Sequence, residues 1–195
     1  SWTVPRALST DEIEQMVADF AASAARLERC GWSGVEISCG HGHLFHQFLS
    51  PQSNVRADDY GGTADNRARF LRETIQAIRA SCSGRFLLAL KLPGDDGMPG
   101  GIGPREAAEI TQLVADPNEI DYLCYTWGTH SHTLDLHIPD MHCPRATFVG
   151  TTRTLQASAR GIPVMAVGLI TDPAEAGGII ERGDAALVGL GRPLV

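Results

Sequence analysis

The sequence predicts an α/β fold built on a parallel sheet. Short apolar runs alternate with amphipathic segments of helical period along the chain. The run at residues 85–91 is apolar between its charged ends, as in strands buried on both faces, and glycines follow the last two runs. Strands that alternate with helices indicate parallel strands joined by right-handed crossovers.

The first elements follow from capping signals and periodicity. Ser9 and Glu12 form a capping box, which predicts a helix that begins there. Its apolar stripe ends at Gly31, and a strand is expected over 34–38. A long polar loop follows, after which Thr63 is expected to cap a second helix.

The remaining elements repeat the same unit. They are expected, in order, as a strand at 85–91, a loop at 93–103, a helix from Pro104, a strand at 120–125, a helix near 147–160, a strand at 163–167, a helix at 172–181 and a strand at 185–189. Two architectures fit this order, a doubly wound open sheet and a (β/α)₈ barrel. No G-x-G-x-x-G follows any strand, so a dinucleotide-binding open sheet has no direct support.

Composition restricts the class of protein. The 195 residues suffice for one domain, and the net charge of −7 carries no basic face. Nucleic acid and anionic membrane are therefore not expected as main partners. No apolar run approaches the roughly 20 residues of a membrane span. The five cysteines form no C-x-x-C pair, which favours reduced thiols in a cytoplasmic protein.

The ends of the last two predicted strands suit a phosphate. Gly168 ends one strand, and Gly189, Gly191 and Arg192 follow the other. In (β/α)₈ barrels the loops after the last two strands commonly bind phosphate through backbone N–H groups. Glycine lets the backbone approach closely, and arginine adds charge. The alternative is that these glycines only end strands.

A histidine-rich segment follows the first predicted strand. His41 and His43 lie just past its end, where a barrel places catalytic side chains. The H-x-H spacing also suits a metal-dependent hydrolase. Further histidines in the loop after a later strand are candidate ligands: His130, His132, His137 and His142. No carboxylate stands at an obvious third-ligand position, so we expect no metal.

Taken together, these residues resemble the NADH:flavin oxidoreductases of the Old Yellow Enzyme type. The resemblance is ordered and covers nearly the whole chain. It is carried by Gly34-Val35-Glu36-Ile37, His41-Gly42, Gln47-Phe48-Leu49-Ser50-Pro51, Asn54, Arg56, Asp58, Tyr60-Gly61-Gly62, Asn66-Arg67, Arg69-Phe70, Lys91, Gly168 and Gly191-Arg192.

The resemblance implies a (β/α)₈ barrel with FMN at its C-terminal mouth. Residues 1–195 would then be one partial barrel of about five β/α units, strands four to eight, without strands one to three and whatever follows strand eight. It assigns cofactor contacts to Lys91, where relatives carry arginine, and to Gly168, Gly191 and Arg192. Leu169 stands where relatives often carry another arginine.

The substrate side departs from the common pattern. Ser38, His41 and His43 occupy positions where many ene-reductases of the family have His, His or Asn, and Tyr. His41 and His43 are the expected catalytic residues, and Ser38 the expected substrate contact. The loop after the third strand is similar to the branch with trimethylamine dehydrogenase and N-methyl amino-acid demethylases. Trp127 and Asp135 are its candidate contacts to a cationic amine.

The expected activity is an FMN-dependent oxidation of small N-methylated amines or a reduction of activated alkenes, with NAD(P)H as partner. Some members of the branch carry an iron–sulfur cluster, which would lie outside this chain. Two alternatives remain: a metal hydrolase that uses His41 and His43, and an inactive fragment that self-associates through its open sheet edges. A homo-oligomer is expected.

Overall fold

The structure is a computed structural model that describes residues 6–194. Its centre is one parallel sheet in which the strands follow each other in sequence order. The strands are β1 (Gly34–Ser38), β2 (Leu87–Asp95), β3 (Tyr122–Trp127), β4 (Val164–Ala166) and β5 (Leu187–Val188). All four pairings are parallel, which confirms the predicted sheet.

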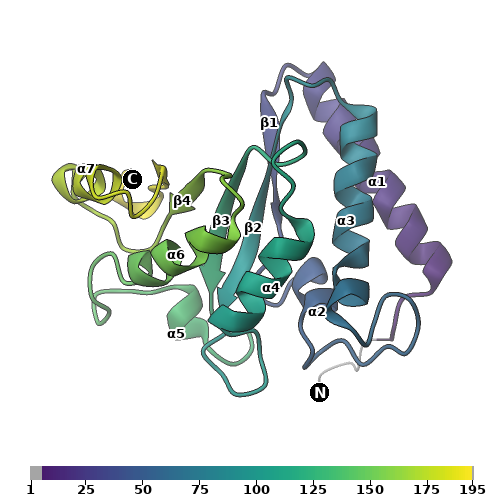
Figure 1. The fold of residues 1–195 in the computed structure, drawn as a ribbon, viewed down its shortest axis with the longest axis horizontal. Coiled ribbons are helices and arrows are strands. Elements are labelled where there is room, and N and C mark those ends of the chain that lie inside the picture. Colours follow the sequence, from purple (N-terminus) through teal and green to yellow (C-terminus); the bar gives the residue numbers. More distant parts are fainter. Residues whose placement is uncertain (1–5, 195) are drawn as a thin grey trace.

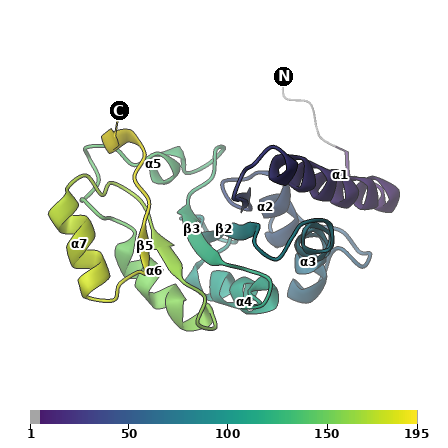
Figure 2. The same ribbon diagram turned by 90° about the horizontal axis from the view of Figure 1, so that it is seen from above.

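Helices connect the strands (Figure 1). They are α1 (Thr10–Arg29), α2 (Leu44–Leu49), α3 (Ala64–Ser81), α4 (Pro104–Val114), α5 (Leu134–His137), α6 (Val149–Leu155), η1 (Gln156–Ser158), α7 (Pro173–Glu181) and η2 (Arg192–Leu194). Helices α3, α4 and α6 lie on the same side of the sheet (Figure 2). The residues of β1 to β4 that face them, such as Ile37, Leu90, Leu123 and Val164, are buried.

This arrangement is a run of successive β/α units of a (β/α)₈ barrel, as the resemblance implied. Helices cover one face, and the opposite face carries the more polar side chains Glu36 and Lys91. The carboxyl ends of all the strands meet at one edge of a parallel sheet. Loops from distant parts of the sequence are therefore brought together there, where a barrel places its functional residues.

The predicted helix starts are confirmed by their caps. The Ser9 hydroxyl accepts a hydrogen bond from the Glu12 N–H, and the Glu12 carboxylate accepts one from the Ser9 N–H at 2.8 Å. Thr63 caps α3, and Pro104 is the first residue of α4. Asp172, predicted inside the last helix, is its N-cap.

Several boundaries were predicted wrongly. The polar loop after β1 contains the short helix α2, whose Phe45, His46 and Leu49 are buried. The strands expected at 85–91 and 120–125 lie further along, because residues 83–86 form a turn and Phe86 packs into the core. The helix expected near 147–160 is shorter and ends in the 3₁₀ turn η1.

The loop between α2 and α3 is held by a buried asparagine. The Asn54 side-chain N–H₂ donates to the carbonyls of Phe48 at 2.7 Å and Tyr60 at 2.8 Å, and its Oδ1 accepts from the Arg56 N–H at 3.1 Å. The Arg56 guanidinium pairs with Asp58. Several of the residues that carry the family resemblance therefore fix the shape of this one loop.

We expect Asn54→Ala to lower the free energy of unfolding by about 2 kcal/mol, because it leaves buried carbonyls without donors. Denaturant unfolding of the full-length protein measures this change. Gln52→Ala in the same loop is the control, since Gln52 is exposed and its side chain makes no hydrogen bond within the described residues. Equal midpoints for the two variants would contradict this role.

Candidate functional site

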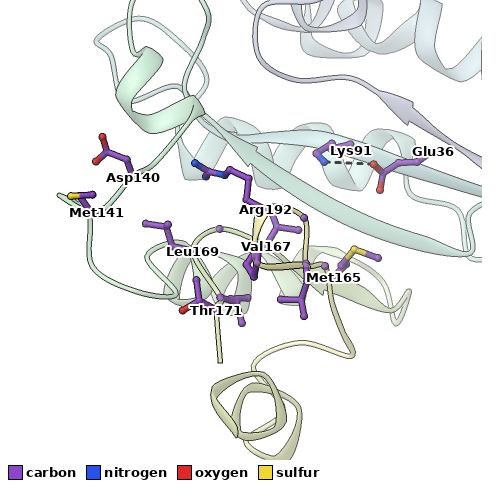
Figure 3. A pocket seen from close by; sticks show the side chains of 15 residues that line it. Glu36, Lys91, Asp140, Met141, Met165, Val167, Leu169, Thr171 and Arg192 are labelled. Atoms are coloured by element: carbon purple, nitrogen blue, oxygen red, sulfur yellow. Dashed lines mark ion pairs between the residues drawn. The ribbon is translucent and has the colours of Figure 1, made fainter. Parts of the chain in front are cut away.

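A cavity of about 810 Å³ lies at the carboxyl ends of β4 and β5 and extends over the polar face of the sheet. Figure 3 shows Arg192 and Val167 between two groups of side chains, the Lys91–Glu36 pair on one side and Asp140, Met141 and Leu169 on the other. We call this space the mouth cavity. It is lined by Glu36, Lys91, Asp140, Met141, Met165, Val167, Gly168, Leu169, Ile170, Thr171, Gly189, Leu190, Gly191, Arg192 and Pro193.

Backbone donors are available on two sides of the mouth cavity. Within residues 6–194, the N–H groups of Gly168, Leu169, Gly191 and Arg192 find no acceptor in the chain. Gly168 has a φ of 103°, a conformation that side chains rarely adopt, and this turns the chain sharply after β4. The ends of two neighbouring strands thus present unpaired N–H groups, the donor type that binds phosphate.

Two cations face the mouth cavity. Lys91 lies on β2 with its Nζ 3.7 Å from Glu36 Oε1 on β1. Arg192 donates from Nη2 to the Pro139 carbonyl at 2.8 Å, which fixes the guanidinium over the cavity. The predicted cofactor residues Lys91, Gly168, Gly191 and Arg192 therefore line one space. Glu36 was not predicted as a site residue, although its alternation with Ile37 along β1 places it on this face.

Leu169 is held in a left-handed conformation with a φ of 52°. A branched side chain in this region costs free energy, so the surrounding structure must impose the conformation. The Leu169 carbonyl accepts from the Ala146 N–H at 3.2 Å, which ties the turn after β4 to the start of α6. Leu169 thus places an apolar side chain at the cavity wall.

Four imidazoles form a cluster beside the mouth cavity, from the loops after β1 and β3. The ring of His41 lies 3.7 Å from that of His137, the ring of His43 lies 4.9 Å from that of His130, and the rings of His130 and His137 are 4.2 Å apart, all between centroids. We call these residues the histidine cluster. The sequence indicated His130 and His137 only as candidate metal ligands, together with His132 and His142, which are exposed.

His41 is positioned by the loop after β3. Its φ is 61°, and it forms an isolated parallel bridge with Thr129. Its Nδ1 lies 3.3 Å from the Gly128 carbonyl oxygen. Burial lowers the pKa of His41 to about 4, with a further contribution from the neighbouring His137. Burial and His130 lower the pKa of His137 as well.

The low pKa of His41 predicts a loss of stability in mild acid. The imidazole has an ordinary pKa of 6.5 and a folded pKa of about 4, so between these values the unfolded chain binds more protons. The free energy of unfolding therefore decreases as pH falls from 6.5 towards about 4. Denaturation midpoints across this range measure the slope, which His41→Asn should reduce and His132→Asn, at an exposed histidine, should not. Identical slopes in all three proteins would contradict this prediction.

The histidine cluster does not offer a metal site. Within residues 6–194, no group of three or more His, Cys, Asp or Glu side chains is arranged to hold a metal ion. Imidazoles that share a tetrahedral ion have ring centroids about 5 Å apart, given Zn–N bonds of about 2 Å. The centroids of His41 and His137 are closer than this, whereas those of His43 and His130, 4.9 Å apart, fit the spacing but form only a pair. The hydrolase alternative therefore finds no ligand set here.

The predicted substrate contacts are dispersed. Trp127 lines a smaller cavity of about 170 Å³, but its ring is stacked on Phe148 with centroids 4.2 Å apart and planes 4° apart. Asp135 is exposed on α5 and lines neither cavity. Ser38 lies beside an apolar groove next to α1 rather than in the mouth cavity. These residues do not form an amine cage, since nothing brings them to one point.

The chain is similar to proteins of a known family. The model of the NADH:flavin oxidoreductase / NADH oxidase family matches residues 1–195. The chain belongs to this family. An NADPH dehydrogenase of Clostridium acetobutylicum is 33% identical over 192 residues, 98% of this chain and 54% of that protein. An N,N-dimethylglycine/sarcosine dehydrogenase of Chromohalobacter salexigens is 32% identical over 96% of this chain and 27% of that protein.

The fold of family relatives agrees with the barrel assignment. The structure of histamine dehydrogenase from Rhizobium sp. 4-9 superposes with a TM-score of 0.86 at 25% identity, covering 96% of this chain and 27% of that one. The chain thus spans about half or less of the length of these relatives. No helix among residues 6–194 is both long and apolar enough to cross a membrane.

Proposed function

We propose that the protein containing this chain is an FMN-dependent oxidoreductase and that the mouth cavity holds the FMN. The unpaired N–H groups that follow β4 and β5 carry this proposal, because they offer a phosphate site where a barrel commonly has one. Arg192 would add charge to the phosphate site. Lys91, in the same cavity, would stabilise negative charge on the reduced flavin ring.

When bound, the flavin would accept a hydride from a substrate C–H bond or donate a hydride to an activated alkene, with NAD(P)H as its partner. The chain's own residues would orient the substrate and move protons. His41 lines the smaller cavity that shares Lys91 and Arg192 with the mouth cavity, and His43 lies in the same histidine cluster, so we propose these two as the catalytic groups. The names of the relatives support both an amine and an NAD(P)H reaction.

We place the protein in the cytoplasm, since its five cysteines are free thiols.

The absorbance spectrum of the purified full-length protein tests this proposal. We expect a flavin band that N-methylated amines bleach if the enzyme oxidises C–N bonds, and that only NAD(P)H bleaches if it is a reductase. A colourless protein that does not bind added FMN would contradict the proposal.

The phosphate part of the site has its own test. We expect Arg192→Ala to weaken FMN affinity roughly tenfold, because a charge-assisted contact to phosphate is lost. Titration of the apoprotein, followed by flavin fluorescence, measures this affinity. Arg145→Ala is the matched control, since Arg145 pairs with Glu175 at 3.1 Å and does not line the mouth cavity. Equal affinities would place the phosphate elsewhere.

The 195-residue chain by itself would self-associate. In the described sheet β1 and β5 are the edge strands, and β1 borders an apolar groove of about 370 Å³ that includes Phe20, Leu27 and Ile78. An unpaired strand beside apolar surface is prone to pair with a second copy. Light scattering of this chain tests the expectation, and a monodisperse monomer would overturn it.

A further inference from the structure

Lys91 is the only lysine of the chain, whose other side chains of permanent positive charge are all arginine. It lies within β2, and Glu36 of β1 is beside it on the polar face of the sheet (Figure 3). An ammonium group on a flexible stem can turn between two acceptors, whereas the planar guanidinium of arginine is held by its fork of donors. The mouth cavity therefore contains one cation that can move.

The register of the sheet leaves room for Glu36 to reach Lys91. Glu36 and Tyr122 are both Cα partners of Ala89, one on each side of β2. Side chains at paired positions of a parallel sheet point to the same face, and Ala89 offers only a methyl group between the two longer ones. The Glu36 side chain can therefore extend across β2, and its Oε1 lies 3.7 Å from Lys91 Nζ.

The ion pair between Glu36 and Lys91 is loose. Charge-assisted N–H···O bonds are about 2.7–2.9 Å long, and the 3.7 Å between Nζ and Oε1 is well beyond this. Within residues 6–194 the Lys91 ammonium donates no hydrogen bond, although the side chain of Lys91 is only 32% exposed and that of Glu36 only 27%. Its N–H groups are thus available to a molecule in the mouth cavity, which both residues line.

In the described part of the chain, Glu36 is the only carboxylate within 4.0 Å of the Lys91 ammonium. The Cα partners of Lys91 on the neighbouring strands are Ser38 and Cys124. Serine carries no charge, and burial raises the pKa of the Cys124 thiol to about 12, so that the thiol stays protonated. Asp140, the other carboxylate of the mouth cavity, lies on its opposite side (Figure 3). The charge of Lys91 is therefore opposed by Glu36 alone.

We propose that Glu36 is a positioning residue that competes with the reduced flavin for the Lys91 ammonium and thereby lowers the reduction potential of the FMN. This inference rests on the proposed function. Two electrons and one proton convert the neutral oxidised ring into a reduced ring with a negative charge, and a cation near the ring favours the reduced form. Glu36 draws that cation towards β1, so its carboxylate opposes the reduction. The pair thus biases the flavin towards donating a hydride rather than accepting one.

Reduction potentials of the full-length holoenzyme test this inference. We expect Glu36→Gln to raise the affinity for reduced FMN relative to oxidised FMN roughly tenfold, which raises the two-electron potential by about 30 mV. Dye-coupled reductive titration measures the potential and does not depend on turnover. Glu73→Gln is the matched control, because Glu73 accepts a hydrogen bond from the Tyr60 hydroxyl at 2.9 Å and does not line the mouth cavity. An unchanged potential in Glu36→Gln would overturn the inference.

A double-mutant cycle with Lys91→Gln distinguishes the positioning role from direct repulsion between Glu36 and the flavin. If Glu36 acts through Lys91, Glu36→Gln should shift the potential less than half as far in the Lys91→Gln background as in the natural protein. Equal shifts in the two backgrounds would mean that Glu36 acts on the flavin directly, and the positioning role would be refuted.

The pair can also be tested without flavin, by nitrogen NMR of the full-length apoprotein labelled with ¹⁵N at lysine Nζ. The Lys91 signal, assigned by its absence in Lys91→Arg, should shift in Glu36→Gln and stay in place in Glu73→Gln. No shift would contradict the inference, because Glu36 would then not contact the ammonium. A protein that binds no FMN would contradict the proposed function itself, whereas FMN binding with equal potentials would contradict only the role of Glu36.

Discussion

Replacing Gly168 by alanine is expected to destabilise the protein by about 3 kcal/mol and to lower its flavin content. Two effects add at this residue. Its φ of 103° is a conformation that alanine rarely adopts, and a Cβ atom would overlap the ring of Phe148. Phe148 cannot easily move away, because it is stacked on Trp127. The substitution therefore displaces the chain at the point where its N–H groups face the mouth cavity.

Thermal unfolding and the flavin-to-protein absorbance ratio of the full-length protein measure the two consequences of Gly168→Ala. Gly177→Ala is the matched control, since that glycine is inside α7 and a Cβ there meets no atom within 4 Å. Alanine in a helix is favoured over glycine by up to about 1 kcal/mol, so the control should be neutral or more stable. A Gly168→Ala protein with unchanged stability and flavin content would show that neither the φ nor the Phe148 contact constrains the site.

The steric part can be separated from the backbone part by a double-mutant cycle with Phe148→Ala. If the ring causes the clash, Gly168→Ala should cost less in the Phe148→Ala background than in the natural protein. The remaining cost reports the strained φ. Equal costs in both backgrounds would assign the whole effect to the backbone.

The sequence predicts the sheet well because short, mostly apolar segments alternate with segments of helical period. Helix starts follow from local capping chemistry, as at Ser9 and Thr63, and they are confirmed. Helix α2 was missed because it has only six residues and is flanked by polar ones. A short helix of this kind is stabilised by burial of Phe45 and Phe48 against α3 rather than by local propensity.

The sequence predicts more of the residues on the cofactor side of the site than on the substrate side. Gly168 and Arg192 lie just beyond the ends of β4 and β5, and topology alone brings strand ends together. Lys91 lies within β2, on the face of the sheet that the alternation of side chains predicts. The substrate side depends on loop conformation. Which histidines join His41 is decided by the turn at Gly128, whose φ is 68°. No sequence pattern predicts that Phe148 covers one face of Trp127, because the contact depends on how α6 packs.

Replacing Asp96 by alanine is expected to destabilise the protein by about 3–5 kcal/mol. Asp96 is 2% exposed, and its Oδ2 accepts from the Ile102 N–H at 2.8 Å and lies 3.2 Å from His46 Nε2. Because Nδ1 of His46 is buried without a partner, the proton belongs on Nε2, where the carboxylate accepts it. Alanine would leave both donors buried and unpaired.

Asp96 also connects the two loops that shape the substrate side. Its carbonyl accepts from Thr133 Oγ1 at 2.7 Å, and Thr133 Oγ1 in turn accepts from the Thr129 N–H at 2.9 Å. The loop after β2 thereby holds the loop that carries His130 and His137. Loss of the Asp96 carboxylate should loosen the histidine cluster, so we expect broadened histidine NMR signals in addition to a lower unfolding free energy.

Asp95→Ala is the matched control for Asp96→Ala. Asp95 is the preceding residue, and its carboxylate accepts only the Gly97 N–H, at 2.8 Å, within the described residues. Its loss should cost about 1 kcal/mol, the net value of one partly exposed hydrogen bond. Denaturant unfolding of the two full-length variants compares them. If Asp96→Ala were no more costly than Asp95→Ala, the buried pair with His46 would not hold these loops, and the histidine cluster would depend on the Gly128 turn alone.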